Sequence, residues 1–401
     1  MAATVPARRT VLLLALCQSL AMTGNSILGT TAAIVGNLLV AYKTLSTLSV
    51  ALQMTGTMLA TIPAAFLMAR IGRRGGFWTG AAIGVAGAAI ATLAIFADSF
   101  TIFCAGTMLI GANTGFVQQY RFAASEAADD AFRSKAISLV LAGGVVSGLF
   151  GPETAKWSRD LFAPVMFAGC YAIIAALYLA SAVLLCLARL PKPAAPALRN
   201  GGRPLIEIAA QPIFVVAAIA GMVGYGVMSA IMTVTPIAML GCGFAFVDAA
   251  FVIQWHALGM YVPSFITGHL ISRFGVTTIL LVGAGLLLAC CGINLLGVGE
   301  LNFWSALVLL GIGWNFLFVG ATTLLTRSYD ARETAKVQAL NDFLIFGTVA
   351  LSSFSSGALL TGFGWSMVQL AVLPLVVIAT VAVLCLKLRA WRVPAPQYAG
   401  L

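Results

Sequence analysis

The chain has 401 residues, of which 61% are hydrophobic and only 8% are charged. Soluble domains carry about 25% charged residues, so this composition excludes a soluble protein. The net charge of +10 would suit nucleic acid, but the charges are grouped between apolar runs of twenty-odd residues, long enough to cross about 30 Å of hydrocarbon. The sequence therefore predicts an all-α polytopic membrane protein that contacts the lipid bilayer and has no nucleic-acid partner.

Twelve membrane-spanning helices are predicted in chain order. The first six cover residues 10–34, 46–69, 75–97, 101–125, 136–158 and 164–188. The second six cover residues 212–236, 247–271, 276–298, 302–326, 337–360 and 366–389. The stretch between these sets contains three prolines and a pair of glycines, so it cannot continue a helix. We therefore predict an N-terminal six-helix bundle at 1–189, a linker at 190–206 and a C-terminal six-helix bundle at 207–401.

Positive charges fall almost entirely on one side of this topology. If the N-terminus is cytoplasmic and successive spans alternate, 18 of the 22 Lys and Arg residues face the cytoplasm. Lys43, Lys156 and Arg159 face the opposite side, and Arg121 lies within a span. Cytoplasmic loops of membrane proteins carry an excess of Lys and Arg. We therefore expect both termini and the linker to be cytoplasmic.

Two short stretches about two hundred residues apart repeat each other. Residues 70–74 read Arg-Ile-Gly-Arg-Arg after the second predicted span, and residues 272–275 read Ser-Arg-Phe-Gly after the eighth. Arg70 and Arg273 are 203 residues apart, and the charged loops at 129–136 and 330–337 repeat at nearly the same offset. Matching loops at matching places indicate a duplicated unit.

This arrangement resembles the major facilitator superfamily along essentially the whole chain. That family's loop after the second span has a Gly, three residues, Asp-Arg, one residue, and Gly-Arg-Arg or Gly-Arg-Lys. Here the matching residues are Arg70, Gly72, Arg73 and Arg74, and the second copy keeps Arg273 and Gly275. Ala69 and Ser272 stand where the family has Asp, which argues against the charge relay usually attributed to this loop.

The resemblance implies a substrate site near the membrane midplane between two repeats. Polar and aromatic residues in the first, fourth, seventh, eighth and tenth spans are therefore the candidates: Gln18, Asn25, Asn113, Gln118, Tyr120, Tyr225, Gln254, His256, Trp314 and Asn315. A buried polar group is costly unless it is paired, so each is either a ligand group or a polar contact between helices. For His256 the alternatives are a structural donor and a proton carrier.

The sequence has no P-loop or other nucleotide motif, and its two histidines, 13 residues apart, lack flanking carboxylates. We therefore predict that the protein is not an enzyme. We expect a monomeric secondary transporter without a cofactor, a metal site or a catalytic residue. It is expected to move a small organic solute by alternating access, with protons as the coupling ion in symport. Efflux of drugs or metabolites by proton antiport is an alternative, and so is a non-transporting sensor or lipid-moving protein.

Three further segments bear on the substrate and the direction. Residues 144–152 resemble the Gly-x-x-x-Gly-Pro pattern of the superfamily's exporters, although small residues four apart also let helices pack closely. Residues 119–124 and 255–261 resemble a bacterial subgroup associated with riboflavin uptake. That resemblance implies the bacterial inner membrane as the location, and a planar heteroaromatic ligand suits the aromatic and amide candidates.

Arg121 and Asp342 are the charged residues placed well inside predicted spans, one in each half and at similar depth. We predict that they form a gate on the cytoplasmic side, opened when a proton on Asp342 removes one charge of the pair.

Arg121→Asp and Asp342→Arg should each impair transport strongly, because each leaves an unpaired buried charge. The double exchange should restore transport. An exchange no better than the single changes, with an unaltered pH dependence in Asp342→Asn, would exclude the gate.

Overall fold

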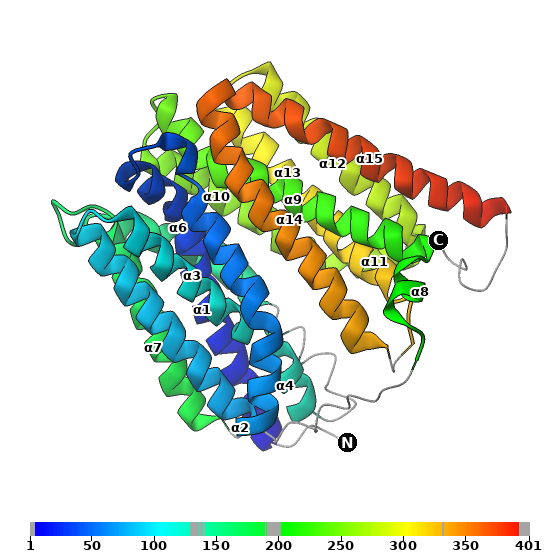
Figure 1. Ribbon diagram of the computed structural model, residues 1–401, viewed down its shortest axis with the longest axis horizontal. Coiled ribbons are helices and arrows are strands. Elements are labelled where there is room, and N and C mark those ends of the chain that lie inside the picture. Colours follow the sequence, from blue (N-terminus) through cyan, green and yellow to red (C-terminus); the bar gives the residue numbers. More distant parts are fainter. Residues whose placement is uncertain are drawn as a thin grey trace. The chain divides into compact units, whose positions relative to one another are not determined.

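The computed structural model describes residues 5–128, 136, 139–140, 142–188, 190, 202–330 and 333–392, and every regular element among them is a helix (Figure 1). The chain divides into two compact units, Met1–Leu198 and Arg199–Leu401. Within the described residues, ten helices are long and apolar enough to cross a membrane, or up to 11 if a bent pair counts as one span. The all-helical membrane fold predicted from the sequence is confirmed.

Unit 1 contains the predicted spans one to six, with the fourth interrupted. The predicted second and third spans both lie within the range of α2, where the non-helical conformation of Gly72 separates two helices, and the fourth span is interrupted after Val117. The helices are α1 (Val5–Leu39), η1 (Lys43–Leu45), α2 (Leu48–Phe96), α3 (Phe100–Val117), α4 (Tyr120–Ala127), α6 (Gly143–Ser158) and α7 (Ala168–Leu187). The charged loop at 129–135 lies outside the described residues, as does part of the predicted start of the fifth span.

Unit 2 contains the predicted spans seven to twelve, with the eighth bent. Its helices are α8 (Leu205–Ala209), α9 (Pro212–Gly241), α10 (Phe246–Tyr261), α11 (Ser264–Phe274), α12 (Val276–Leu296), α13 (Glu300–Leu325), α14 (Thr334–Phe363) and α15 (Trp365–Arg392). The bend between α10 and α11 is 43° and lies at Pro263, which lacks the N–H needed to continue the helix. Most of the predicted linker, residues 191–201, lies outside the described part of the chain.

The two copies of the signature loop share an unusual backbone conformation. Gly72, which interrupts α2, has φ 85° and ψ 161°, and Gly275, between α11 and α12, has φ 83° and ψ 149°. Residues with a Cβ atom rarely adopt such positive φ values, whereas glycine does so readily. This requirement explains why the glycine is present in both copies although the family's Asp is absent from both.

The helix contacts also repeat between the units. A Cβ atom on Gly111 of α3 would collide with the carbonyl oxygen of Gln53 in α2, and one on Gly311 of α13 would collide with that of His256 in α10. Gln53 and His256 are separated by the same 203 residues as the signature loops. Small residues let helix backbones approach closely in a membrane, so the duplication extends to the packing of the helices.

This close contact makes Gly311 sensitive to substitution. Gly311→Ala should lower stability by about 1–3 kcal/mol, because an added methyl group in a tightly packed contact forces the backbones apart. The matched control is Gly285→Ala in α12, where an added Cβ meets no neighbouring atom within 4 Å. The measurement is thermal unfolding of the purified protein in detergent. Equal melting temperatures for the two variants would show that α10 and α13 do not depend on this contact.

Candidate functional site

The candidates on the first span lie on α1 of unit 1. The hydroxyl of Thr114 in α3 donates a hydrogen bond of 3.1 Å to the Asn25 side-chain oxygen. Gln18 is buried, and its side-chain oxygen has no hydrogen-bond partner among the described residues. Thr114 was not selected from the sequence, although it directly follows the candidate Asn113. Its hydroxyl and the two amides give unit 1 a set of polar groups on α1 and α3.

The fourth-span candidates differ in their surroundings. Asn113 is buried beside Gly84 of α2, where an added Cβ would lie 2.8 Å from its side-chain carbon. Tyr120 is also buried; its ring centroid lies 4.5 Å from that of Phe77, and its hydroxyl lies 3.4 Å from the Ser181 hydroxyl of α7. Tyr120 therefore packs α4 against neighbouring helices of its own unit. Gln118 is half-buried between α3 and α4.

Unit 2 gathers the candidates Tyr225 and Trp314 into a group of five aromatic rings. Tyr225 of α9 lies edge-on to Trp314 and Phe318 of α13, with centroids 5.3 and 5.6 Å apart. Phe346 of α14 lies 6.0 Å from Tyr225, and Tyr261 of α10 lies 6.4 Å from Trp314. We call these residues the aromatic cluster. Figure 1 shows α9 beside α13 and α14, the helices that supply four of its members.

Within the aromatic cluster, Trp314 and Phe318 form a stacked pair. Their centroids are 5.0 Å apart and their planes differ by 9°. Trp314 is 7% exposed, and its indole Nε1 is a buried donor without an acceptor among the described residues. The other four rings are half-buried. The cluster thus has accessible ring surface and an unused hydrogen-bond donor, both of which suit a planar aromatic ligand.

Asn315 follows Trp314 in the sequence, but its side chain bonds to residues at the bend between α10 and α11. Its side-chain oxygen accepts a 2.6 Å hydrogen bond from the Thr267 hydroxyl, and its Nδ2 donates to the Met260 carbonyl at 2.7 Å and the Ser264 hydroxyl at 2.5 Å. Asn315 is fully buried. Both of its amide hydrogens are therefore engaged where Pro263 interrupts the helix.

His256 is fully buried on α10. Its Nδ1 lies 2.9 Å from the Leu307 carbonyl oxygen of α13, and because a carbonyl only accepts, Nδ1 must bear the hydrogen. The opposite nitrogen, Nε2, has no partner among the described residues. A structural contact on one side and an unengaged nitrogen on the other are compatible with either role considered for this residue. Gln254 is half-buried on the same helix.

The signature-loop arginines of unit 1 have partners that the sequence did not reveal. Arg73 pairs with Glu126 of α4, with Nη2 to Oε1 at 2.6 Å and Nε to Oε2 at 3.2 Å, and Arg74 donates to the Cys186 carbonyl of α7 at 2.6 Å. Arg70 is exposed. In unit 2, the Arg273 guanidinium lies over the Phe274 ring at 5.3 Å.

The gate candidates lie in different units. The guanidinium of Arg121, in α4 of unit 1, lies 4.9 Å from the Phe122 ring centroid. Asp342 is half-buried in α14 of unit 2. Their pairing stays a prediction.

A model of the Major Facilitator Superfamily matches residues 14–352. The chain belongs to this superfamily. It is 42% identical over 377 residues to the riboflavin transporter RfnT of Brucella anthropi, covering 94% of this chain and 95% of that protein. It is also 29% identical over 309 residues to the uncharacterized MFS-type transporter YdeG of Bacillus subtilis, covering 73% and 71% of the two chains.

Solved structures agree with the superfamily fold. A bacterial homolog of the human lysosomal transporter Spinster, inward-facing and occupied, has a TM-score of 0.72 at 16% identity, covering 95% of this chain and 97% of that one. A mutant of the nucleoside transporter NupG has a TM-score of 0.71 at 12% identity, covering 93% and 99%. The family match and the identity to RfnT show that the chain is a multi-pass MFS secondary transporter of a small molecule and not an enzyme. The family resemblance predicted from the sequence is confirmed.

The contacts of Asn315 predict a mainly structural effect of its loss. Asn315→Ala should lower stability by about 1–3 kcal/mol for each buried group left unsatisfied, and should speed amide hydrogen exchange around residues 258–268. Thr322→Ala is the control, since that exposed hydroxyl bonds only within its own helix, to the Phe318 carbonyl. A variant that melts normally and exchanges normally, but transports poorly, would instead make Asn315 a ligand group.

Proposed function

We propose that this MFS transporter moves riboflavin, by uptake, across the bacterial inner membrane, with both termini and the linker in the cytoplasm. We propose riboflavin as the substrate because the chain is 42% identical to a riboflavin transporter, over 94% of this chain and 95% of the relative. The similarity therefore includes both units and every helix that supplies a candidate residue.

The aromatic cluster supports a flavin as the substrate. Riboflavin has a planar heteroaromatic ring system with carbonyl oxygens and ring nitrogens along its edges. Stacked or edge-on aromatic contacts contribute about 0.5–1.5 kcal/mol each beyond the burial of apolar area. The Nε1 donor of Trp314 lies in the plane of the indole ring, so it can bond to an acceptor at the edge of such a ring system, while the half-buried rings of the aromatic cluster can contact its face.

The polar side chains of unit 1 support a ligand that carries a polar substituent. The ribityl chain of riboflavin has hydroxyl groups that both donate and accept hydrogen bonds. Gln18 has an unengaged side-chain oxygen, and the Asn25 amide bonds to Thr114 through its oxygen. Amides that offer both donors and acceptors suit such a chain. We propose Gln18 and Asn25 as the polar ligand groups of unit 1.

Proton symport is the proposed source of energy, with Asp342 and His256 as the ionisable groups. Asp342 is half-buried in α14, and His256 is fully buried with one ring nitrogen unengaged among the described residues. One glycine of the exporter-like segment has a packing contact: an added Cβ on Gly151 would collide with Ser26 of α1. This contact supports a packing role for the segment.

Proteoliposomes with an imposed proton gradient, acidic outside, test the function. The wild-type protein should accumulate riboflavin, and collapse of the gradient should abolish the accumulation. Trp314→Leu should weaken riboflavin affinity about tenfold, the equivalent of about 1.4 kcal/mol, and Trp314→Phe should lie between this variant and the wild type, because it keeps an aromatic ring but loses the Nε1 donor. Quenching of flavin fluorescence on binding provides a readout independent of transport.

Trp304→Leu is the matched control. Trp304 lies on the same helix, with its ring 5.8 Å from Trp255 and outside the aromatic cluster. Its loss should leave riboflavin affinity unchanged. Failure of the wild-type protein to bind or accumulate riboflavin, while another small solute is accumulated, would overturn the proposed substrate.

A further inference from the structure

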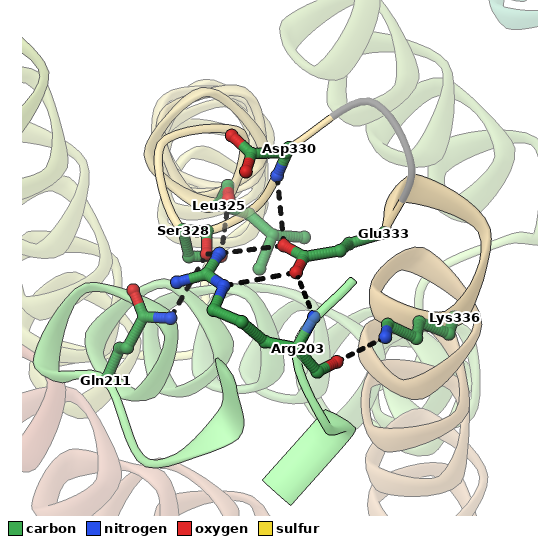
Figure 2. A network of polar contacts seen from close by, with 7 residues as sticks. All are labelled: Arg203, Gln211, Leu325, Ser328, Asp330, Glu333 and Lys336. Carbon is green, nitrogen blue, oxygen red and sulfur yellow. Dashed lines mark hydrogen bonds and ion pairs between the residues drawn. The ribbon is translucent and has the colours of Figure 1, made fainter. Parts of the chain in front are cut away.

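An ion pair between a half-buried arginine and a buried glutamate joins the end of the linker to the turn between α13 and α14 (Figure 2). Arg203 lies in the chain just before α8, and Glu333 is the residue directly before α14. The Nη2–Oε2 distance is 2.7 Å and the Nε–Oε1 distance is 3.1 Å. Glu333 is only 2% exposed. This two-point geometry is the strong form of an Arg–carboxylate interaction.

Backbone groups complete the surroundings of the Glu333 carboxylate. The backbone N–H of Arg203 donates to Oε1 at 2.6 Å, and that of Asp330 donates to Oε2 at 3.1 Å. Each carboxylate oxygen therefore accepts two hydrogen bonds. A buried charge with this many donors is compensated where it lies, so the carboxylate holds the chain at Arg203 and at Asp330 together.

Further bonds extend the contact to neighbouring helix ends, as Figure 2 shows. Arg203 Nη2 and Gln211 Nε2 donate to the Ser328 carbonyl, at 3.0 and 3.3 Å, and the Ser328 hydroxyl donates to the Leu325 carbonyl at 2.8 Å. Lys336, in the first turn of α14, donates to the Arg203 carbonyl. We call this network the linker clasp. It connects the chain before α8 and α9 with the end of α13 and the start of α14.

The lack of a side chain at Gly202 gives the linker clasp the space that it needs. Its φ is 96°, and an added Cβ would lie 2.6 Å from Cγ of Glu333. The linker can therefore approach the carboxylate closely only because a glycine precedes Arg203.

Unit 1 also contains an arginine–carboxylate pair, but there the arginine comes from the signature loop. There Glu126 near the end of α4 pairs with Arg73 of the signature loop. The 203-residue repeat places Val276 at the position of Arg73, and Val276 is fully buried. Unit 2 therefore lacks the signature-loop arginine, and an arginine from the end of the linker pairs with the acidic residue after α13.

We propose that Arg203 is a positioning residue for substrate binding, acting through the linker clasp on the two helices that carry most of the aromatic cluster. α13 supplies Trp314 and Phe318, and α14 supplies Phe346. At 1.5 Å per residue, the clasp lies roughly 15 Å along α13 from Phe318 and roughly 20 Å along α14 from Phe346. Both helices pack against α9, which carries Tyr225, so holding their ends together limits how far they can shift relative to each other and hence the spacing of the rings.

Glu333 of the linker clasp stays ionised throughout the physiological pH range. The Arg203 guanidinium and then its backbone N–H lower the pKa of Glu333 from 4.5 to about 2. Because the pKa is lowered on folding, the stabilisation is present above pH 4.5 and is lost as the pH falls toward 2. Among the described residues, Asp330, Glu207 and Lys336 also lie near the pair. Any pH dependence of transport between about pH 5 and 8 must therefore arise elsewhere.

The test compares Arg203→Ala, Arg203→Lys and Glu333→Gln in purified protein. Arg203→Ala and Glu333→Gln should speed amide hydrogen exchange in residues 203–211 and 325–337. They should also weaken riboflavin binding roughly 2- to 30-fold, the range for coupling through packed elements, with a smaller change in the maximal rate. Arg203→Lys should recover part of the affinity, since it keeps the charge but not the two-point geometry.

Lys156→Ala is the control, because it removes a more exposed ion pair, to Glu153, in unit 1, and it should alter none of these measurements. The ligand measurement rests on the proposed function, whereas hydrogen exchange does not. If riboflavin fails to bind the wild-type protein, exchange still decides whether Arg203 holds the α13–α14 turn. Faster exchange with wild-type riboflavin affinity would make Arg203 purely structural, and wild-type exchange in Arg203→Ala would exclude the clasp altogether.

Discussion

Direct contact between helix backbones is the constraint on which both units depend. Hydrocarbon provides no hydrophobic force that would drive apolar helices together, so packing and polar contacts must hold them. Gly111 and Gly311 allow α3 to touch α2 and α13 to touch α10 at equivalent positions. Once these backbones touch, side chains of α10 and α13 can bond across the contact, as His256 does to Leu307. The glycines thus determine where polar residues can be buried.

The fold was largely predictable because the bilayer demands a simple pattern. Apolar runs of spanning length and the charges between them located the helices, and the glycines of the signature loops marked the breaks at Gly72 and Gly275. The bend of the eighth span had a visible cause in Pro263. The kink at Gly72 lies where the sequence placed a loop, but the direction of the helix that follows it was not predicted.

The candidate site was less predictable, since a polar residue in an apolar run needs a partner that the sequence does not identify. Asn315 looked like a ligand group but bonds to α10 and α11. Phe318 could have been added, because it lies one turn from Trp314 and so shares its helix face. Phe346 could not, because its contact with Tyr225 joins helices far apart in sequence. The pairing of Arg203 with Glu333 spans 130 residues and was hidden for the same reason.

Helix α14 brings together three features that the sequence showed as separate. Glu333 fixes its start through the linker clasp, Asp342 lies two turns further on, and Phe346 follows Asp342 by four residues. Residues four apart share one face of a helix, so an ionisable group and a ring of the aromatic cluster lie on the same face. A change of charge at Asp342 would therefore act on the helix that positions Phe346. Because the start of α14 is fixed, any such movement would be a tilt about the clasp and not a sliding of the whole helix.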